Sequence, residues 1–216
     1  MAVYSKGYET KKRLVLFTYK KLKQQNVSAL TVRDIASENG LSATALYRHF
    51  ESLEYLIVVS SVKFLDEYMK EYGSLMDEDD DLLKAYLDGW KIFNRYAFER
   101  PDIYHRLFWG QYNNEFGDAI QEYFELFPFS GSEKYPVYFY TLFFNDNIQE
   151  RDYLMLHRLS NRKLLTEEDA TYYSRTNPLI VGGMLAEIVH ATPQKRQQVE
   201  EECNQLLEKN FERVFS

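Results

Sequence analysis

Helical periodicity is the feature that most constrains the fold of this 216-residue chain. Apolar residues recur three and four positions apart, a spacing that places them on one face of an α-helix, while the strict alternation typical of strands is scarce. Leu14, Val15 and Leu22 form such a stripe near the start of the sequence, and Val199 and Cys203 begin another near its end. The sequence therefore predicts an all-α protein.

The segment 31–50, TVRDIASENGLSATALYRHF, predicts two short helices joined by a tight turn. Thr31 is the expected N-cap of the first helix, because an acidic residue follows it three positions later. Gly40 supplies the turn. Ser42 is expected to cap a second helix over about residues 43–49.

Such a helix-turn-helix places its second helix in the major groove of DNA. Ile35 and Ala36 give the first helix an inward face, and Leu46 anchors the second helix. The outward residues of the second helix are short where base edges would be met. They become polar and aromatic where phosphates would be met, so the segment is suited to DNA recognition.

The distribution of charge agrees with this interpretation, although the whole chain carries a net charge of −7. Residues 1–56 contain nine Lys/Arg and five Asp/Glu, a net charge of +4, and the remaining residues carry −11. A basic head on an acidic body is typical of a DNA-binding module attached to a domain that avoids phosphates. Chance clustering of solvated charges is the alternative explanation.

Over about residues 12–56 the chain resembles the tetracycline-repressor (TetR) family of transcriptional regulators. The family pattern runs from a first helix through T-v-r-D-I-A, a glycine turn and L-Y-x-h-F. The residues that carry the resemblance are Thr31, Ile35, Ala36, Gly40, Leu46, Tyr47, His49 and Phe50.

The resemblance implies roles for the residues that match it. Thr31 and Tyr47 are expected to contact phosphates with His49 close by, and Arg33 to lie near the DNA backbone or a base edge. Short residues at the start of the second helix are expected to approach the bases. The predicted DNA-binding residues are Thr31, Arg33, Ser42, Ala43, Thr44, Tyr47, Arg48 and His49.

Three positions depart from the family pattern. Asn26 replaces the usual glycine at the end of the first helix, a change that asparagine tolerates. Leu53 stands where the family usually has lysine, and Glu51 adds negative charge nearby. Loss of one phosphate contact weakens DNA binding and flattens its dependence on salt.

The predicted domains are a DNA-binding domain over residues 1–52 and a helical effector-binding and dimerisation domain over residues 53–216. A helix from Leu53 to about Tyr72 is expected to connect them. The resemblance implies dimerisation through the last two helices, the first of which Pro178 is expected to kink or interrupt.

Adjacent glycines at positions 182 and 183 support close helix approach at a dimer interface, because glycine weakens a helix by roughly 1 kcal/mol relative to alanine. Packing within the monomer is the alternative explanation for these small residues and for the apolar stripe of the last helix.

The resemblance also implies an effector cavity in the larger domain, where aromatic residues are crowded between Tyr86 and Tyr153. Aromatic side chains provide apolar walls with polar atoms that orient a ligand. They favour an apolar or aromatic effector. The net negative charge of the larger domain is also compatible with a cationic effector. Ordinary core packing is the alternative for each residue. The predicted pocket residues are Trp90, Phe93, Tyr104, Phe108, Trp109, Tyr112, Tyr140 and Phe144.

Other classes of protein find little support in the sequence. It has no apolar run of the roughly 18 residues that a membrane span requires, and its N-terminus lacks the apolar stretch of a signal peptide. Its lone Cys203 cannot form an internal disulfide, so a cytoplasmic protein with no membrane partner is expected. Phosphate-loop, nucleophile-elbow and metal-ligand motifs are missing, so no enzyme, cofactor or metal site is predicted.

The sequence thus predicts a ligand-responsive transcriptional repressor. It is expected to bind a palindromic double-stranded DNA operator as a homodimer and to be released from it by a small effector. The alternative is a helical small-molecule-binding protein whose DNA binding is weakened.

Overall fold

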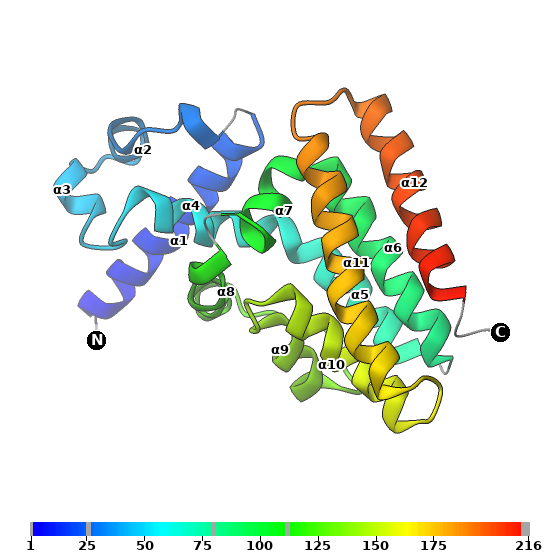
Figure 1. Cartoon of the computed structure of the whole chain (residues 1–216). Helices are drawn as coiled ribbons and strands as arrows, with labels where there is room; N and C mark the ends of the chain where they lie inside the picture. Colours follow the sequence, from blue (N-terminus) through cyan, green and yellow to red (C-terminus); the bar gives the residue numbers. More distant parts are fainter. Residues whose placement is uncertain (1, 25–26, 79–80, 111–112, 213–216) are drawn as a thin grey trace. The chain divides into compact units, whose positions relative to one another are not determined.

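The computed structural model describes residues 2–24, 27–78, 81–110 and 113–212, and every regular element among them is helical (Figure 1). The predicted all-α class is confirmed: an N-terminal helix-turn-helix is followed by a larger helical region. The chain divides into two compact units. Unit 1 comprises residues 1–65 and 114–129, and unit 2 comprises residues 66–113 and 130–216.

Unit 1 is built on α1, whose fully buried Leu14 and Val15 lie in the core with Ile35 and Leu46 of the helix-turn-helix. α4 packs against α1, and α2 packs against α3. The position expected to end α1, Asn26, lies outside the described residues. The elements of this unit are α1 (Ala2–Leu22), the 3-10 turn η1 (Val27–Ala29), α2 (Val32–Glu38), α3 (Ala43–Leu46), α4 (Leu53–Val62), the 3-10 turn η2 (Lys63–Leu65) and α8 (Asn113–Leu126).

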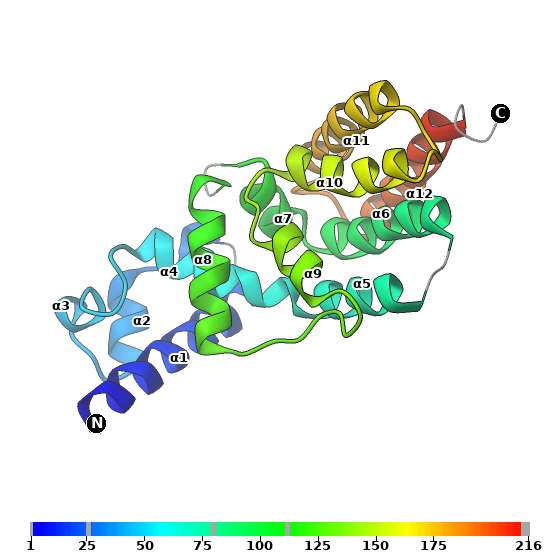
Figure 2. The ribbon, with the colours of Figure 1, turned by 90° about the horizontal axis from the view of Figure 1, so that it is seen from below.

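α8 joins unit 1 although it lies far from the other elements in sequence (Figure 2). The Tyr8 hydroxyl donates hydrogen bonds to the backbone carbonyls of Glu125 and Leu126, at 2.9 and 3.1 Å. Lys11 forms an ion pair with Glu122 of the same helix. The compact unit that contains the helix-turn-helix is therefore larger than residues 1–52; the functional boundary at residue 52 stays a prediction.

The prediction of one continuous helix from Leu53 to about Tyr72 was wrong in its continuity. α4 ends at Val62, the turn η2 follows, and α5 begins at Asp66. The hydroxyls of Ser60 and Ser61 donate to the carbonyls four residues earlier, at 2.6 and 2.7 Å, and such bonds compete with the helical ladder. The expected inward positions are confirmed as fully buried: Leu56, Val59, Val62, Leu65 and Met69.

Unit 2 is arranged around α6, against which α5, α7, α10, α11 and α12 pack. Cys203 on α12 is fully buried, and burial raises the pKa of its thiol to about 12, as expected for an inert core cysteine. The elements of this unit are α5 (Asp66–Glu78), α6 (Leu82–Glu99), α7 (Pro101–Phe108), α9 (Pro136–Phe143), α10 (Ile148–Asn161), α11 (Glu167–Glu187) and α12 (Pro193–Phe211).

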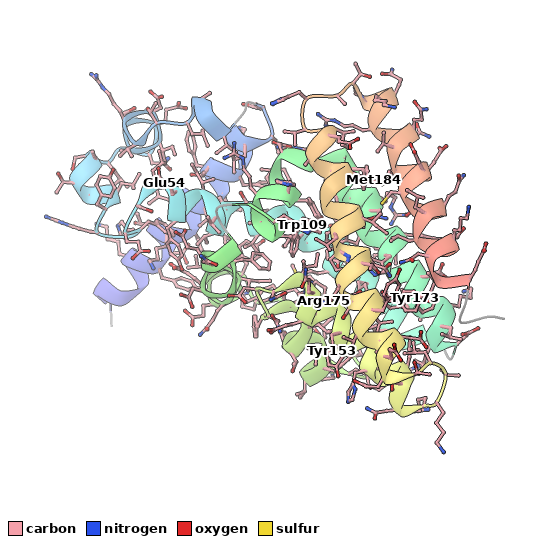
Figure 3. All side chains as sticks on the ribbon, in the orientation of Figure 1. Glu54, Trp109, Tyr153, Tyr173, Arg175 and Met184 are labelled. Atoms are coloured by element: carbon pink, nitrogen blue, oxygen red, sulfur yellow. The ribbon has the colours of Figure 1, made fainter. Side chains whose placement is uncertain are left out.

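α11 bears on two expectations from the sequence. Pro178 does not interrupt this helix, which runs from Glu167 to Glu187 with the proline buried inside, and the alternative of a kink at Pro178 stays a prediction. Gly182 is explained by packing within the monomer, since a Cβ there would lie 2.5 Å from Nε1 of Trp109 at the end of α7 (Figure 3). At the neighbouring Gly183, by contrast, a Cβ would meet no atom within 4 Å.

Candidate DNA-binding and effector sites

Local hydrogen bonds define the first half of the helix-turn-helix. The Thr31 hydroxyl caps α2 by accepting a bond of 3.1 Å from the backbone N–H of Asp34. At the other end, the N–H of Leu41 donates to the carbonyl of Ala36 at 2.9 Å, and the N–H of Gly40 donates to Ser37 at 3.1 Å. This pair of bonds is a Schellman ending, and it requires the left-handed φ of +68° found at Gly40.

The second half is shorter than predicted. Ser42 caps α3 as expected, its hydroxyl accepting a bond of 3.1 Å from the N–H of Ala45. The α-helix ends at Leu46, whereas the sequence predicted a helix to about His49. The N–H groups of Arg48 and His49 bond to carbonyls three residues back, so the chain tightens into turns before Phe50 enters the core.

The structure leaves the predicted DNA-binding face open. Ile35, Ala36 and Leu46 are buried, as expected, and fix the opposite face in the core. The Tyr47 side chain is 49% exposed although it is large and aromatic, which suits a contact made only with a partner. The exposed residues of the predicted set are Thr31, Arg33, Ser42, Ala43, Thr44, Tyr47 and Arg48, and His49 is half-buried.

The electrostatics of this face are mixed. Burial and the neighbouring cations Lys11 and Arg13 lower the pKa of His49, so its imidazole is neutral near pH 7. α8 brings four acidic residues into unit 1, so residues 1–65 and 114–129 together hold ten Lys/Arg and nine Asp/Glu, a net charge of +1. The acidic residues of α8 thus largely balance the net positive charge of residues 1–56 within the unit.

This geometry defines a protein of the helix-turn-helix class of DNA-binding regulators. Residues 18–58 match the family model for bacterial regulatory proteins of the tetR family. The chain therefore carries the DNA-binding domain of a TetR-family transcriptional regulator. No curated protein matches the chain.

Unit 2 contains a cavity with an empty volume of about 480 Å³, including the part open to solvent. Of the eight predicted pocket residues, Trp90 and Phe93 line it. Sequence reasoning missed most of the wall. The lining residues are Tyr68, Tyr72, Tyr86, Gly89, Trp90, Phe93, Leu142, Phe143, Ile148, Arg151, Asp152 and Met155.

The other predicted pocket residues lie elsewhere. Tyr104 and Phe108 are buried behind Phe93, with ring centroids 5.5 and 5.3 Å from its ring. Tyr140 stacks on Phe144, and Phe144 is 41% exposed.

Two further members of the predicted set remain. Trp109 lies against Gly182, its ring 6.1 Å from that of Phe93. Tyr112 lies outside the described residues. Whether any member of the set binds an effector stays a prediction.

A buried carboxyl group anchors one wall of the cavity. One oxygen of Asp152 accepts a bond of 2.9 Å from the Tyr86 hydroxyl, and the other accepts 3.0 Å from Nε1 of Trp90. Asn177 donates to the same hydroxyl at 2.9 Å. Burial raises the pKa of Asp152 to about 8, against the opposing effects of its two donors and of Arg151.

Arg151 is a basic residue that lines the cavity, and two aromatic rings lie close to its guanidinium. Its guanidinium carbon lies 5.0 Å from the ring centroid of Phe108 and 4.8 Å from that of Phe143. The residue is 7% exposed, and its Nη1 atom is buried with no hydrogen-bond partner. The sequence did contain a signal for the buried position of Asp152. Its helical spacing with Ile148 and Leu159 on α10 places its carboxyl group on the inward stripe of that helix.

Within the described residues, no group of three or more potential metal ligands is assembled. None of the helices that the structure describes is both long and apolar enough to span a membrane.

Proposed function

We propose that this protein is a ligand-responsive transcriptional repressor that binds a near-palindromic operator as a homodimer and is released by a small, largely apolar effector. The observation that carries the proposal is a capped helix-turn-helix whose outer face is exposed, in the same chain as a unit containing an aromatic cavity. Regulation by a small molecule needs both a DNA-reading element and a ligand site with differential affinity for two states.

The dimer proposal is supported by exposed apolar side chains on the last two helices. Tyr172 and Leu179 on α11 are 49% and 61% exposed, and Leu206 on α12 is 43% exposed. Gly183 adds a position where a second chain meets no side chain. A two-fold dimer places two recognition helices in symmetric half-sites, so the operator is a near-palindrome.

The connection between the sites runs along the chain. Tyr68 and Tyr72 of α5 line the cavity, and α5 continues through η2 into α4, which packs on α1 of the DNA-binding unit. A ligand that binds one position of α5 better than another shifts the population of DNA-binding dimers. By linkage, operator DNA weakens ligand binding by the same factor.

Fluorescence anisotropy with a labelled fragment from upstream of the protein's own gene tests DNA binding. We expect saturable binding that Tyr47→Ala weakens and that the matched variant Tyr135→Ala, a similarly exposed tyrosine of unit 2, leaves intact. Equal binding to unrelated DNA would contradict sequence-specific regulation.

Sedimentation tests the dimer. Leu179→Glu is expected to shift the protein toward monomer, and Val137→Glu, at a position 79% exposed on α9, is the control. A wild-type monomer at micromolar concentration would contradict the proposal.

The second candidate function, a small-molecule-binding protein with weakened DNA binding, is favoured by the acidic α8 and by Leu53 and Glu51. Absence of specific DNA binding together with retained ligand binding would support it.

A further inference from the structure

We propose that the cavity of unit 2 binds a small planar aromatic anion whose acidic group accepts hydrogen bonds from the guanidinium of Arg151. This inference rests on the proposed function in taking the ligand as the effector. It adds the charge of the ligand and the residue that recognises it.

The unmet hydrogen-bonding capacity of the cavity belongs to a donor. Arg151 lines the cavity and is more than nine-tenths buried, yet its Nη1 has no partner among the described residues. The guanidinium is hydrogen-bonded to Tyr68, but its buried Nη1 group lacks an acceptor, and such a group is costly because its hydration is lost without replacement. Hydrogen bonds between a guanidinium and an anion are stronger than those between neutral groups, so a carboxylate is an acceptor that fits this free donor.

The carboxyl group of the cavity, by contrast, is already engaged. Both oxygens of Asp152 hold hydrogen bonds, from Tyr86 and Trp90, and Asn177 completes the group by donating to Tyr86. A cationic ligand would have to compete with these bonds for the carboxyl group. The arrangement therefore favours an anion over a cation.

The remaining wall selects for a flat apolar body. The aromatic residues that line it include Tyr68, Tyr72, Trp90, Phe93 and Phe143, and aromatic rings pack well against the flat rings of a ligand.

Three probes of nearly equal shape test the charge preference: 2-naphthoate, 2-naphthamide and 2-naphthylmethylamine. Binding is measured by calorimetry and by the fluorescence of the tryptophans, on the full chain without DNA. We expect naphthoate to bind at least about tenfold more tightly than naphthamide, and the amine to bind most weakly. Equal binding of the acid and the amide, or tightest binding of the amine, would overturn the proposal.

Variants assign the preference to Arg151. Arg151→Gln is expected to abolish the advantage of naphthoate over naphthamide, Arg151→Lys to keep part of it, and the exposed Arg162→Gln at the end of the same helix to change nothing. An advantage retained in full by a folded Arg151→Gln would overturn the assignment. If that variant does not fold, the assignment is tested with Arg151→Lys, which should keep only part of the advantage, and with the ranking of the three probes on the wild-type protein.

The effector role is tested separately by adding naphthoate to the protein–operator complex. Tight naphthoate binding that leaves operator affinity unchanged would overturn the proposed function while leaving the ligand class in place. Release of operator by naphthoate, but not by naphthamide at equal concentration, is the expected result.

Discussion

The helix-turn-helix of unit 1 and the cavity of unit 2 differ in the sequence separation of the bonds that build them. In the helix-turn-helix, the bonds that set the geometry join residues at most five positions apart, such as Leu41 to Ala36 and Ala45 to Ser42. In the cavity, Tyr86 donates to Asp152, 66 residues away, and accepts from Asn177, 91 residues away. A local site can be read from its sequence pattern, whereas a cavity emerges only when distant helices pack.

The two regions also differ in solvent exposure. The caps of the helix-turn-helix are exposed, and each is worth about 1 kcal/mol. The polar groups of the cavity are buried, so removing one partner leaves the others unsatisfied at a higher cost. Local structure in unit 1 should therefore tolerate single polar changes better than the cavity does.

Leu46→Ala should have the largest effect on the helix-turn-helix. Its side chain is fully buried, and such truncations cost about 2–5 kcal/mol because they leave a cavity. We expect operator affinity and thermal stability to fall together, with naphthoate binding by unit 2 less affected. The exposed Thr44→Ala is the control for stability, and equal stability of the two variants would contradict the assignment of Leu46 to the core.

Tyr47→Ala and Thr44→Ala should separate affinity from specificity. A phosphate contact carries no sequence information, so Tyr47→Ala should weaken binding to all operators by about 1.5–3 kcal/mol. A base contact does carry it, so Thr44→Ala should change which sequences are selected from a random pool. An unchanged preferred site in Thr44→Ala would show that the start of α3 does not face the bases.

Gly40→Ala isolates the backbone requirement of the turn. No atom lies within 4 Å of a Cβ built there, so the cost comes from the left-handed φ alone and should be about 1–2 kcal/mol. Gly40→Asn should cost less, because asparagine tolerates this conformation. Chemical denaturation measures both variants, and equal losses would mean that the conformation is not the cause.

The most gradual effect expected is the dependence of stability on pH. The pKa of Asp152 rises from 3.8 to about 8 on folding, so between these values the folded state holds a proton that the unfolded state releases. Stability is full below pH 4 as far as this group is concerned, and it falls as pH rises, by at most about 1.4 kcal/mol per pH unit. The pKa values of Tyr68 and Tyr86 are raised by burial and lie above this window.

Asp152→Asn should flatten this profile between pH 5 and 8 in denaturation experiments. The exposed Asp146→Asn, in the loop before α10, is the matched control and should leave the slope unchanged. A slope that persists in Asp152→Asn would assign it to other groups.

The sequence alone determined the all-α class and the helix-turn-helix, including its caps at Thr31 and Ser42 and its turn at Gly40. These features depend on side-chain chemistry within a few residues, which a pattern states directly. The exact end of α3 was missed, because the shift to tighter turns depends on where Phe50 enters the core.

Only the tertiary structure decided the charge of the DNA-binding unit, the reason for Gly182 and the composition of the cavity. α8 returns to unit 1 from residue 114 onward and cancels most of its positive charge, and Gly182 makes room for Trp109 within the same chain. Neither Arg151 nor Asp152 was singled out from the sequence. Both are buried because α10 packs into unit 2 with that face inward, and burial depends on all the helices around it at once.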